Sequence, residues 1–128
     1  MSIKIVAAIF LTVSHGSLWA ADWKKVGGTE RADFYADVSS ISRIGTVAKM
    51  WTLRDYKTPQ TDETGKFLSS KDLVELDCKD VNRRIVYSSF HSKNMGDGVT
   101  LGSTTTASPW APISPESISE LMWKIACK

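Results

Sequence analysis

The sequence has few of the residues from which catalytic and metal sites are built. It contains two histidines, and only His91 lies outside the first 20 residues. A lone histidine lacks the partners that would activate a nucleophile or complete a metal site. No serine lies in a G-x-S-x-G motif, and no glycine-rich loop carries the lysine of a phosphate-binding loop. The sequence therefore predicts a protein that is not an enzyme, with no catalytic residue, no cofactor and no metal.

An excess of charge of one sign is also missing. Without Lys4, 15 basic and 14 acidic side chains remain in the chain. Proteins that bind nucleic acid as their main partner usually carry a strongly basic face. We therefore expect no nucleic-acid partner.

No apolar run in the sequence is long enough to cross a membrane. The run at residues 5–13 is about half of the roughly 20 residues that a spanning helix needs. It follows Lys4 and leads into small and polar residues that end at Ala20, a pattern typical of a secretory signal peptide rather than a membrane anchor. We predict a signal peptide at residues 1–20, cleaved within one residue of Ala20, and one exported domain at residues 21–128. No cysteine follows the cleavage region to carry a lipid anchor, so we expect a periplasmic or secreted protein, compatible with association at the cell surface.

Both cysteines, Cys78 and Cys127, lie in the predicted domain. In an exported protein an even pair of cysteines favours a disulfide. A shared metal ion and a bridge between two chains are the alternatives, but a CxxC spacing and nearby histidines are missing. We predict a disulfide within the chain.

Short segments of alternating apolar residues, separated by turn residues, predict antiparallel strands. The expected strands are at residues 23–26, from 34, and at 46–56, 67–78, 84–91 and 99–106. The segment 46–56 is apolar on both faces, which predicts a central strand, and Ile85 and Tyr87 are expected to share one face of their strand. Residues 37–41 read as a turn capped by Asp37, and residues 57–65 read as a long polar turn.

A helix is predicted near the C-terminus. Ser114, Pro115 and Glu116 form a start signal, with a capping residue, a proline at the first helical position and an acid in the first turn. Four apolar residues then follow at helical spacing and predict a stripe that packs on the sheet: Ile118, Leu121, Met122 and Ile125. The predicted fold is α+β, an antiparallel meander with a C-terminal helix packed on it.

Two surface features are candidates for binding. Lys79, Arg83 and Arg84 surround one predicted turn, with Lys71 nearby, and such a patch could hold a sulfated polysaccharide or an acidic protein segment. The alternative is a solvated turn whose charges are balanced by neighbouring acids.

The tryptophans are the second feature, since this residue is enriched in binding hot spots. Trp51 and Trp123 fit core positions by their spacing, which leaves Trp23 and Trp110 as candidates.

An ordered set of short matches runs through the predicted domain. It consists of Trp23, Phe34-Tyr35-x-Asp37-x-Ser39-Ser40-Ile41, Val47-x-x-x-Trp51, Ser69-Ser70-Lys71, Glu75-Leu76-Asp77-Cys78, Arg84, Tyr87, Gly96-Asp97-Gly98, Trp110, Ile113-x-Pro115-x-Ser117 and Cys127. This set resembles the surface-adhesin protein E family, small exported proteins of proteobacteria. The resemblance implies a sheet packed with helix, a bridge between the two cysteines and a homodimer. For the founding adhesin it implies binding to vitronectin, laminin, plasminogen and heparin.

Two functional hypotheses follow. The first is an adhesin-like binding protein that contacts a host matrix protein or a sulfated polysaccharide. The alternative is a soluble periplasmic accessory or inhibitor protein with a partner protein in the cell envelope.

Overall fold

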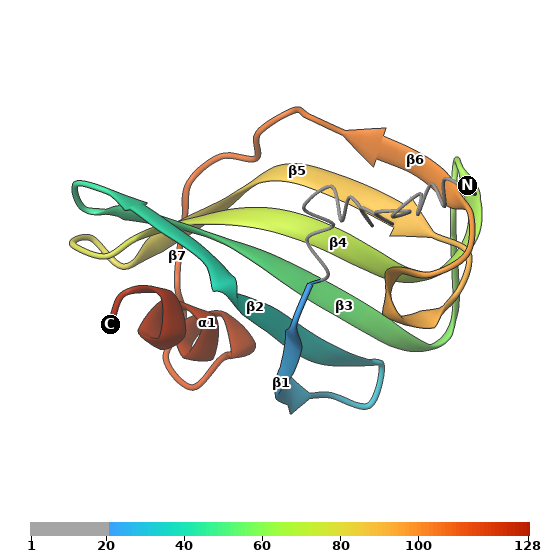
Figure 1. The fold of residues 1–128 in the computed structure, drawn as a ribbon, viewed down its shortest axis with the longest axis horizontal. Helices are drawn as coiled ribbons and strands as arrows, with labels where there is room; N and C mark the ends of the chain where they lie inside the picture. Colours follow the sequence, from blue (N-terminus) through green and yellow to red (C-terminus); the bar gives the residue numbers. More distant parts are fainter. Residues whose placement is uncertain (1–20) are drawn as a thin grey trace, which may run out of the picture.

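The computed structural model describes residues 21–128, and the predicted signal peptide lies outside the described residues. Six antiparallel strands follow one another across the sheet in chain order, and a short seventh strand pairs with β5 (Figure 1). The strands are β1 (Trp23–Gly28), β2 (Ala32–Ile44), β3 (Val47–Asp62), β4 (Gly65–Asp77), β5 (Asn82–His91), β6 (Thr100–Thr104) and β7 (Ala111–Pro112); a 3₁₀ turn, η1 (Asn94–Gly96), follows β5, and the helix α1 (Ile118–Ala126) comes last. The predicted meander with a C-terminal helix is confirmed.

The main core lies between α1 and one face of the sheet. Ala48 and Met50 of β3 and Leu76 of β4 are fully buried there, and Met122 and Ala126 come from the helix. β3 pairs with β2 on one side and β4 on the other, so its predicted central position is confirmed. Leu121, expected on the buried stripe, is 43% exposed, because Met122 and Ala126 hold the inward positions of the helix.

The helix begins three residues later than predicted. The N-cap is Ser117, whose Oγ accepts a hydrogen bond from the Glu120 amide at 3.1 Å. Glu116 has φ +63°, which is incompatible with a right-handed helix, so Pro115 and Glu116 belong to a turn. The Glu120 carboxylate reaches back to the Glu116 amide at 3.3 Å, an arrangement close to a capping box. The prediction of a start at Ser114 was wrong.

The strands β3 and β4 extend through the predicted polar turn. β3 continues to Asp62 and β4 begins at Gly65, so the reversal takes only Glu63 and Thr64. Asp62 Oδ1 accepts from the Thr64 amide at 2.8 Å, and Gly65 has φ +115°. This hairpin projects beyond the core, and a strand with water on both sides needs no apolar residues.

Two register shifts correct the predicted strand pattern. β2 runs through residues 37–41 as a bulge and not a turn, although Asp37 Oδ1 does accept from the Ser39 amide, at 3.1 Å. In β5, Leu73 pairs with Tyr87 but Val74 pairs with Ile85, so one extra residue lies between them. Ile85 and Tyr87 therefore face opposite sides of the sheet, contrary to the prediction.

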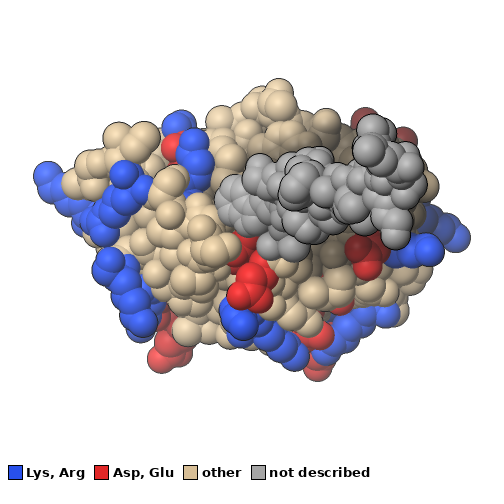
Figure 2. All heavy atoms as spheres, viewed as in Figure 1, with Lys and Arg blue, Asp and Glu red and all other residues tan. Residues whose placement is uncertain are grey.

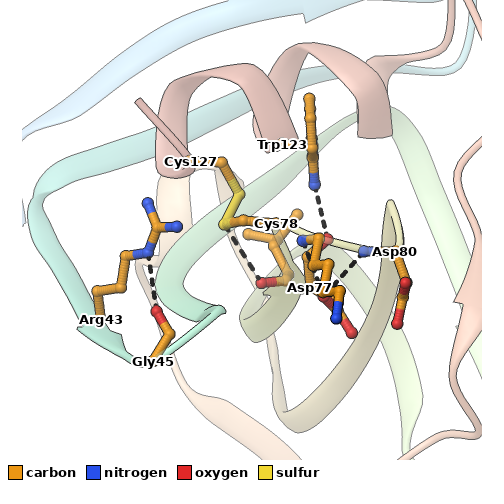
Figure 3. The surroundings of a disulfide bond; sticks show 9 residues. Arg43, Gly45, Asp77, Cys78, Asp80, Trp123 and Cys127 are labelled. Carbon is orange, nitrogen blue, oxygen red and sulfur yellow. Dashed lines mark hydrogen bonds between the residues drawn. A yellow bond between two sulfur atoms is a disulfide. The ribbon is translucent and has the colours of Figure 1, made fainter.

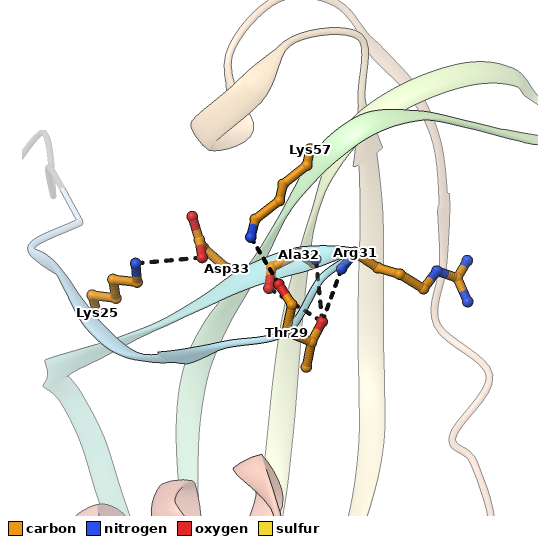
Figure 4. A network of polar contacts seen from close by, with 6 residues as sticks. All are labelled: Lys25, Thr29, Arg31, Ala32, Asp33 and Lys57. Atoms are coloured by element: carbon orange, nitrogen blue, oxygen red, sulfur yellow. Dashed lines mark hydrogen bonds and ion pairs between the residues drawn. The ribbon is translucent and has the colours of Figure 1, made fainter.

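The turn between β1 and β2 is held by Thr29. Its Oγ1 accepts from the amides of Arg31 and Ala32 at 3.2 and 3.3 Å, and its carbonyl oxygen accepts from Lys57 Nζ at 2.9 Å (Figure 4). Lys25 and Asp33 form an ion pair across the same two strands at 3.4 Å. The first hairpin is thus tied to β3 by a side chain as well as by its strand pairing.

The predicted disulfide between Cys78 and Cys127 is confirmed (Figure 3). Cys78 follows β4 and Cys127 follows α1, so the bridge ties the helix to the middle of the sheet. Beside it, Trp123 Nε1 donates to the Asp77 carbonyl oxygen at 2.9 Å. Trp123 packs against the core as predicted.

Candidate functional site

The face of the sheet opposite α1 carries a row of aromatic side chains. Trp23 pairs with Asp37, Asp37 with Trp51, Trp51 with Leu73, and Leu73 with Tyr87. Directly paired residues in an antiparallel sheet point to the same side. The register therefore places two tryptophans and a tyrosine from three different strands on one line across the sheet.

This row borders a cavity of about 370 Å³, which we call the open-face hollow. The residues that line it are Ala21, Trp23, Asp37, Trp51, Lys71, Tyr87, Ser89, His91 and Thr100. Its volume falls in the range of small-ligand pockets, which combine apolar walls with a few polar groups. The hollow is therefore a candidate binding site on this face.

The rings of Trp51 and Tyr87 meet edge to face, with centroids 5.6 Å apart and planes at 77°. Trp51 is half-buried here rather than packed under the helix, so its sequence-based assignment to the core does not describe its surroundings. Trp23, a candidate from the sequence, also lines the hollow. Trp110 lies elsewhere, with the Arg84 guanidinium 4.6 Å from its ring centroid.

His91 is held inside the hollow by two hydroxyl groups. Its Nε2 lies 2.8 Å from Ser89 Oγ and its Nδ1 lies 3.4 Å from Thr100 Oγ1. Burial lowers the pKa of His91, and the positive charge of Lys71 lowers it further, against the opposing effect of Asp97. The imidazole of His91 therefore takes up a proton less readily than that of a free histidine.

The distance between Ser89 Oγ and His91 Nε2 is that of a nucleophile and its base, but the other ring nitrogen, Nδ1, faces the hydroxyl group of Thr100. In a Ser–His–Asp triad a carboxylate at this nitrogen orients the ring and stabilises its charged form. The sequence analysis treated His91 as an isolated strand-end residue. The signal for this contact was the Ser-x-His spacing, which puts both side chains on one face of a strand.

Lys71 provides the positive charge of the hollow. Among residues 21–128 it makes no ion pair, whereas Asp37, the acid of the hollow, is almost fully buried and is hydrogen-bonded to Ser39. The stem of Lys71 passes so close to Gly96 that a side chain at Gly96 would collide with it. The 3₁₀ turn thus limits where the Lys71 stem can lie, and the register places Lys71 two residues along β4 from Leu73, the member of the aromatic row on that strand.

The structure distributes the four predicted patch residues over different surfaces. Lys71 lies in the hollow and Lys79 is exposed on the turn after β4. Arg83 and Arg84 are neighbours in β5 and point to opposite sides: Arg83 toward the helix side, and Arg84 toward Glu75, whose Oε1 it contacts at 2.7 Å. Figure 2 shows basic side chains around the outline of the visible face, interspersed with acids.

Two classes of feature are not found in the part of the chain that the structure describes. Residues 21–128 contain no group of three or more histidine, cysteine or acidic side chains placed to hold a metal ion. They also contain no helix of the length and apolar character that a bilayer span requires.

The sequence matches the family model described as surface-adhesin protein E over residues 23–128. The fold is similar to solved structures of Haemophilus influenzae protein E. One is 12% identical in sequence with a TM-score of 0.61, and the match covers 84% of this chain and 89% of the Haemophilus chain. Another, from non-typeable Haemophilus influenzae, is 12% identical with a TM-score of 0.64, and the match covers 84% of this chain and 76% of the other.

A comparison with curated proteins found no relative that matches this sequence. At these identities the solved structures establish a shared fold alone. The family match extends over almost the whole of the described domain and includes both cysteines. The chain therefore belongs to the surface-adhesin protein E family.

Proposed function

We propose that this chain is an exported, adhesin-like binding protein that acts without catalysis and holds an acidic segment of a partner protein in the open-face hollow. Membership of the surface-adhesin family supports the general function. The observation that carries the site is that Lys71, which makes no ion pair among residues 21–128, lines the same hollow as Trp51 and Tyr87.

The chemistry of the hollow favours a ligand with both an apolar part and a negative charge. Aromatic side chains supply a large contact area with little loss of conformational freedom, which makes them common anchors in interfaces. An ammonium group that has no carboxylate partner in its own domain gains most from an anionic ligand. A carboxylate next to an apolar side chain, as in an acidic segment of a host matrix protein, meets both requirements.

Binding in the open-face hollow and binding at the turn after β4 can be distinguished by charge-reversal variants. Immobilised matrix proteins and heparin should be tested against the oxidised protein and three charge-reversal variants: Lys71→Glu, Lys79→Glu and Lys66→Glu. We expect Lys71→Glu to weaken binding to the matrix protein at least tenfold. Lys66→Glu, on the exposed part of the β3–β4 hairpin, is the matched control and should bind like the wild type.

The turn after β4 supports the second candidate ligand, a sulfated polysaccharide, because Lys79 is exposed there. Loss of heparin retention in Lys79→Glu with Lys71→Glu unaffected would move the binding surface from the hollow to this turn. Equal loss in all three variants would indicate a general effect of net charge and would contradict a defined site.

Adhesin-like function also requires that the domain be accessible from outside the cell. An impermeant amine-reactive label, added to intact cells of the native organism, should modify the exposed lysines. Protection until the outer membrane is opened would contradict the adhesin function and would favour the periplasmic accessory alternative, with a partner in the envelope.

A further inference from the structure

A second cavity, of about 320 Å³, lies on the other side of the sheet, between the N-terminal end of α1 and strands β2 to β5. Its floor comes from alternate residues of the central strands, among them Arg54 and Asp72, and its wall from Ile118 and Met122 of the helix. The bulge in β5 directs Arg83 into the same space. The cavity is therefore separate from the open-face hollow and independent of the function proposed for it.

The charges that line this cavity do not balance. Two guanidinium groups, Arg54 and Arg83, share one carboxylate, Asp72, which is buried. Asp72 Oδ2 lies 3.3 Å from Arg54 Nη2, and Asp72 Oδ1 accepts from Ser88 Oγ at 2.6 Å. Both oxygens of the carboxylate are thus engaged, and one positive charge is left over.

The excess charge falls on Arg83. Among residues 21–128, no acceptor lies within hydrogen-bond distance of its guanidinium and no acid lies within ion-pair distance. Burial lowers the pKa of Arg83, and the like charge of Arg54 lowers it further, against the opposing effect of Asp72. By contrast, burial lowers the pKa of Arg54, but Asp72 and Tyr56 together outweigh burial, so that this pKa is raised. Arginine remains charged in either case, so Arg83 is a partly buried cation with no protein partner among residues 21–128.

The start of the helix supplies donors to this cavity. α1 points its N-terminal end at the cavity through Ser117, Ile118 and Ser119. The first amides of a helix have no acceptor within the helix, and the helix dipole favours negative charge at this end. Ser117 Oγ satisfies only the Glu120 amide.

The remaining walls are apolar. Phe34, Val74, Leu76 and Ile85 from the strands, with Ile118 and Met122 from the helix, line the space beside the two arginines. We propose that this cavity binds an amphipathic oxyanion, with a carboxylate or phosphate head between Arg54 and Arg83 and an apolar body along Ile118 and Met122. The planar guanidinium groups suit either kind of head because both present paired oxygens.

The test uses three probes that share one alkyl chain: octanoate, octyl phosphate and octanol. Each is titrated into the oxidised ¹⁵N-labelled protein, with binding read from the amide shifts at the start of α1 and from the fitted dissociation constant. We expect the two anions to bind at millimolar concentration or below, and octanol at least tenfold more weakly. The tighter anion identifies the source of the head group, carboxylate or phosphate ester.

Two variants of adjacent residues provide the matched comparison. Arg83→Gln should weaken binding of the preferred anion at least tenfold, and Arg83→Lys should recover part of it. Arg84→Gln, which removes a guanidinium from the opposite face of the same strand, should leave binding unchanged. Circular dichroism melts of all three variants establish that each is folded before binding is compared.

Octanol binding as tightly as the anions would overturn the proposal, since the cavity would then recognise only apolar bulk. Equal loss in Arg83→Gln and Arg84→Gln would overturn it as well, because net charge and not the cavity would then govern binding. A single charge-assisted contact gives a dissociation constant on the order of 10 mM. If neither anion binds at that concentration, the proposal of an anion site in this cavity is overturned.

Discussion

Reduction of the Cys78–Cys127 bridge should destabilise the domain strongly. The bridge joins residues 49 positions apart and closes a loop that contains β5, β6, β7 and the helix. For a loop of this length the chain-entropy model gives about 4 kcal/mol of stabilisation at 25 °C. Because 1 kcal/mol shifts the melting temperature of a domain of this size by about 4–8 °C, reduction should lower it by about 15–30 °C.

The helix is the element that should respond first. At nine residues, α1 is too short to be stable by itself. Without the bridge it is held by the burial of Met122 and Ala126 and by the hydrogen bond from Trp123 to Asp77. Reduction should therefore change the fluorescence of Trp123 at temperatures where the sheet signal in circular dichroism is still native.

The assay is a pair of thermal melts, with and without a phosphine reductant, followed by circular dichroism and by tryptophan fluorescence. The double variant Cys78→Ser/Cys127→Ser is the control, and it should melt like the reduced protein and ignore the reductant. Mass spectrometry of alkylated samples verifies that both thiols are free. A melting temperature within about 3 °C of the oxidised value, with reduction verified, would refute the argument that loop closure stabilises this fold.

Two further predictions concern the core and the pH dependence. Met50→Ala should lower the free energy of unfolding, measured by urea denaturation, by about 2–5 kcal/mol, because Met50 is fully buried beneath the helix. Lys49→Ala, on the opposite face of the same strand, is the control. An equally large loss of stability in Lys49→Ala would contradict the faces assigned to these two residues. The folded-state pKa of His91 lies below its ordinary value of 6.5, so the unfolded chain binds this proton more readily and acidification favours unfolding. The free energy of unfolding should therefore fall as the pH drops below about 6.5, and His91→Gln should reduce this dependence on pH. An unchanged dependence in the variant would show that other groups cause it.

The parts of the fold that sequence predicts well are those where burial dictates the pattern. The strand that became β3 is apolar on both faces because it lies in the middle of the sheet, and Met122 falls on the apolar stripe because α1 covers a single face. The helix start was misplaced because Ser114 and Ser117 both carry a capping hydroxyl. The positive φ of Glu116, which decides between them, has no signature in the sequence.

The errors elsewhere have two physical causes. The arm of β3 and β4 beyond the core is wet on both sides, so its polar residues look like a turn. The bulge in β5 cannot be recognised in the sequence Ile85, Val86, Tyr87. It nevertheless places every residue of the strand before it on the opposite face from the one that regular alternation predicts. Arg83 was grouped with Arg84 because residues 80–83 were predicted to be a turn, whereas β5 already begins at Asn82 and places these two neighbours on opposite faces.

The candidate site was only partly predictable. Lys71 and Trp23 were singled out, but for separate reasons and not as neighbours. The hollow draws residues from β1, β2, β3, β4, β5 and β6, and no local pattern reports which of them meet. Only the backbone register, with its bulges, brings them together on one face.

The meander has a consequence for the order in which the protein folds. Strands β1 to β5 each pair with the next strand in the chain, so the sheet can grow hairpin by hairpin through short loop closures. The helix that covers its apolar face comes from the last segment and packs against β1, β2 and β3, which are made first. Until that segment arrives, Ala48, Met50 and Leu76 face water on a nearly complete sheet, and such transient apolar surfaces are where chains associate wrongly. We therefore expect the yield of refolding to fall as the protein concentration rises, because this face can meet the same face of another chain before the helix covers it.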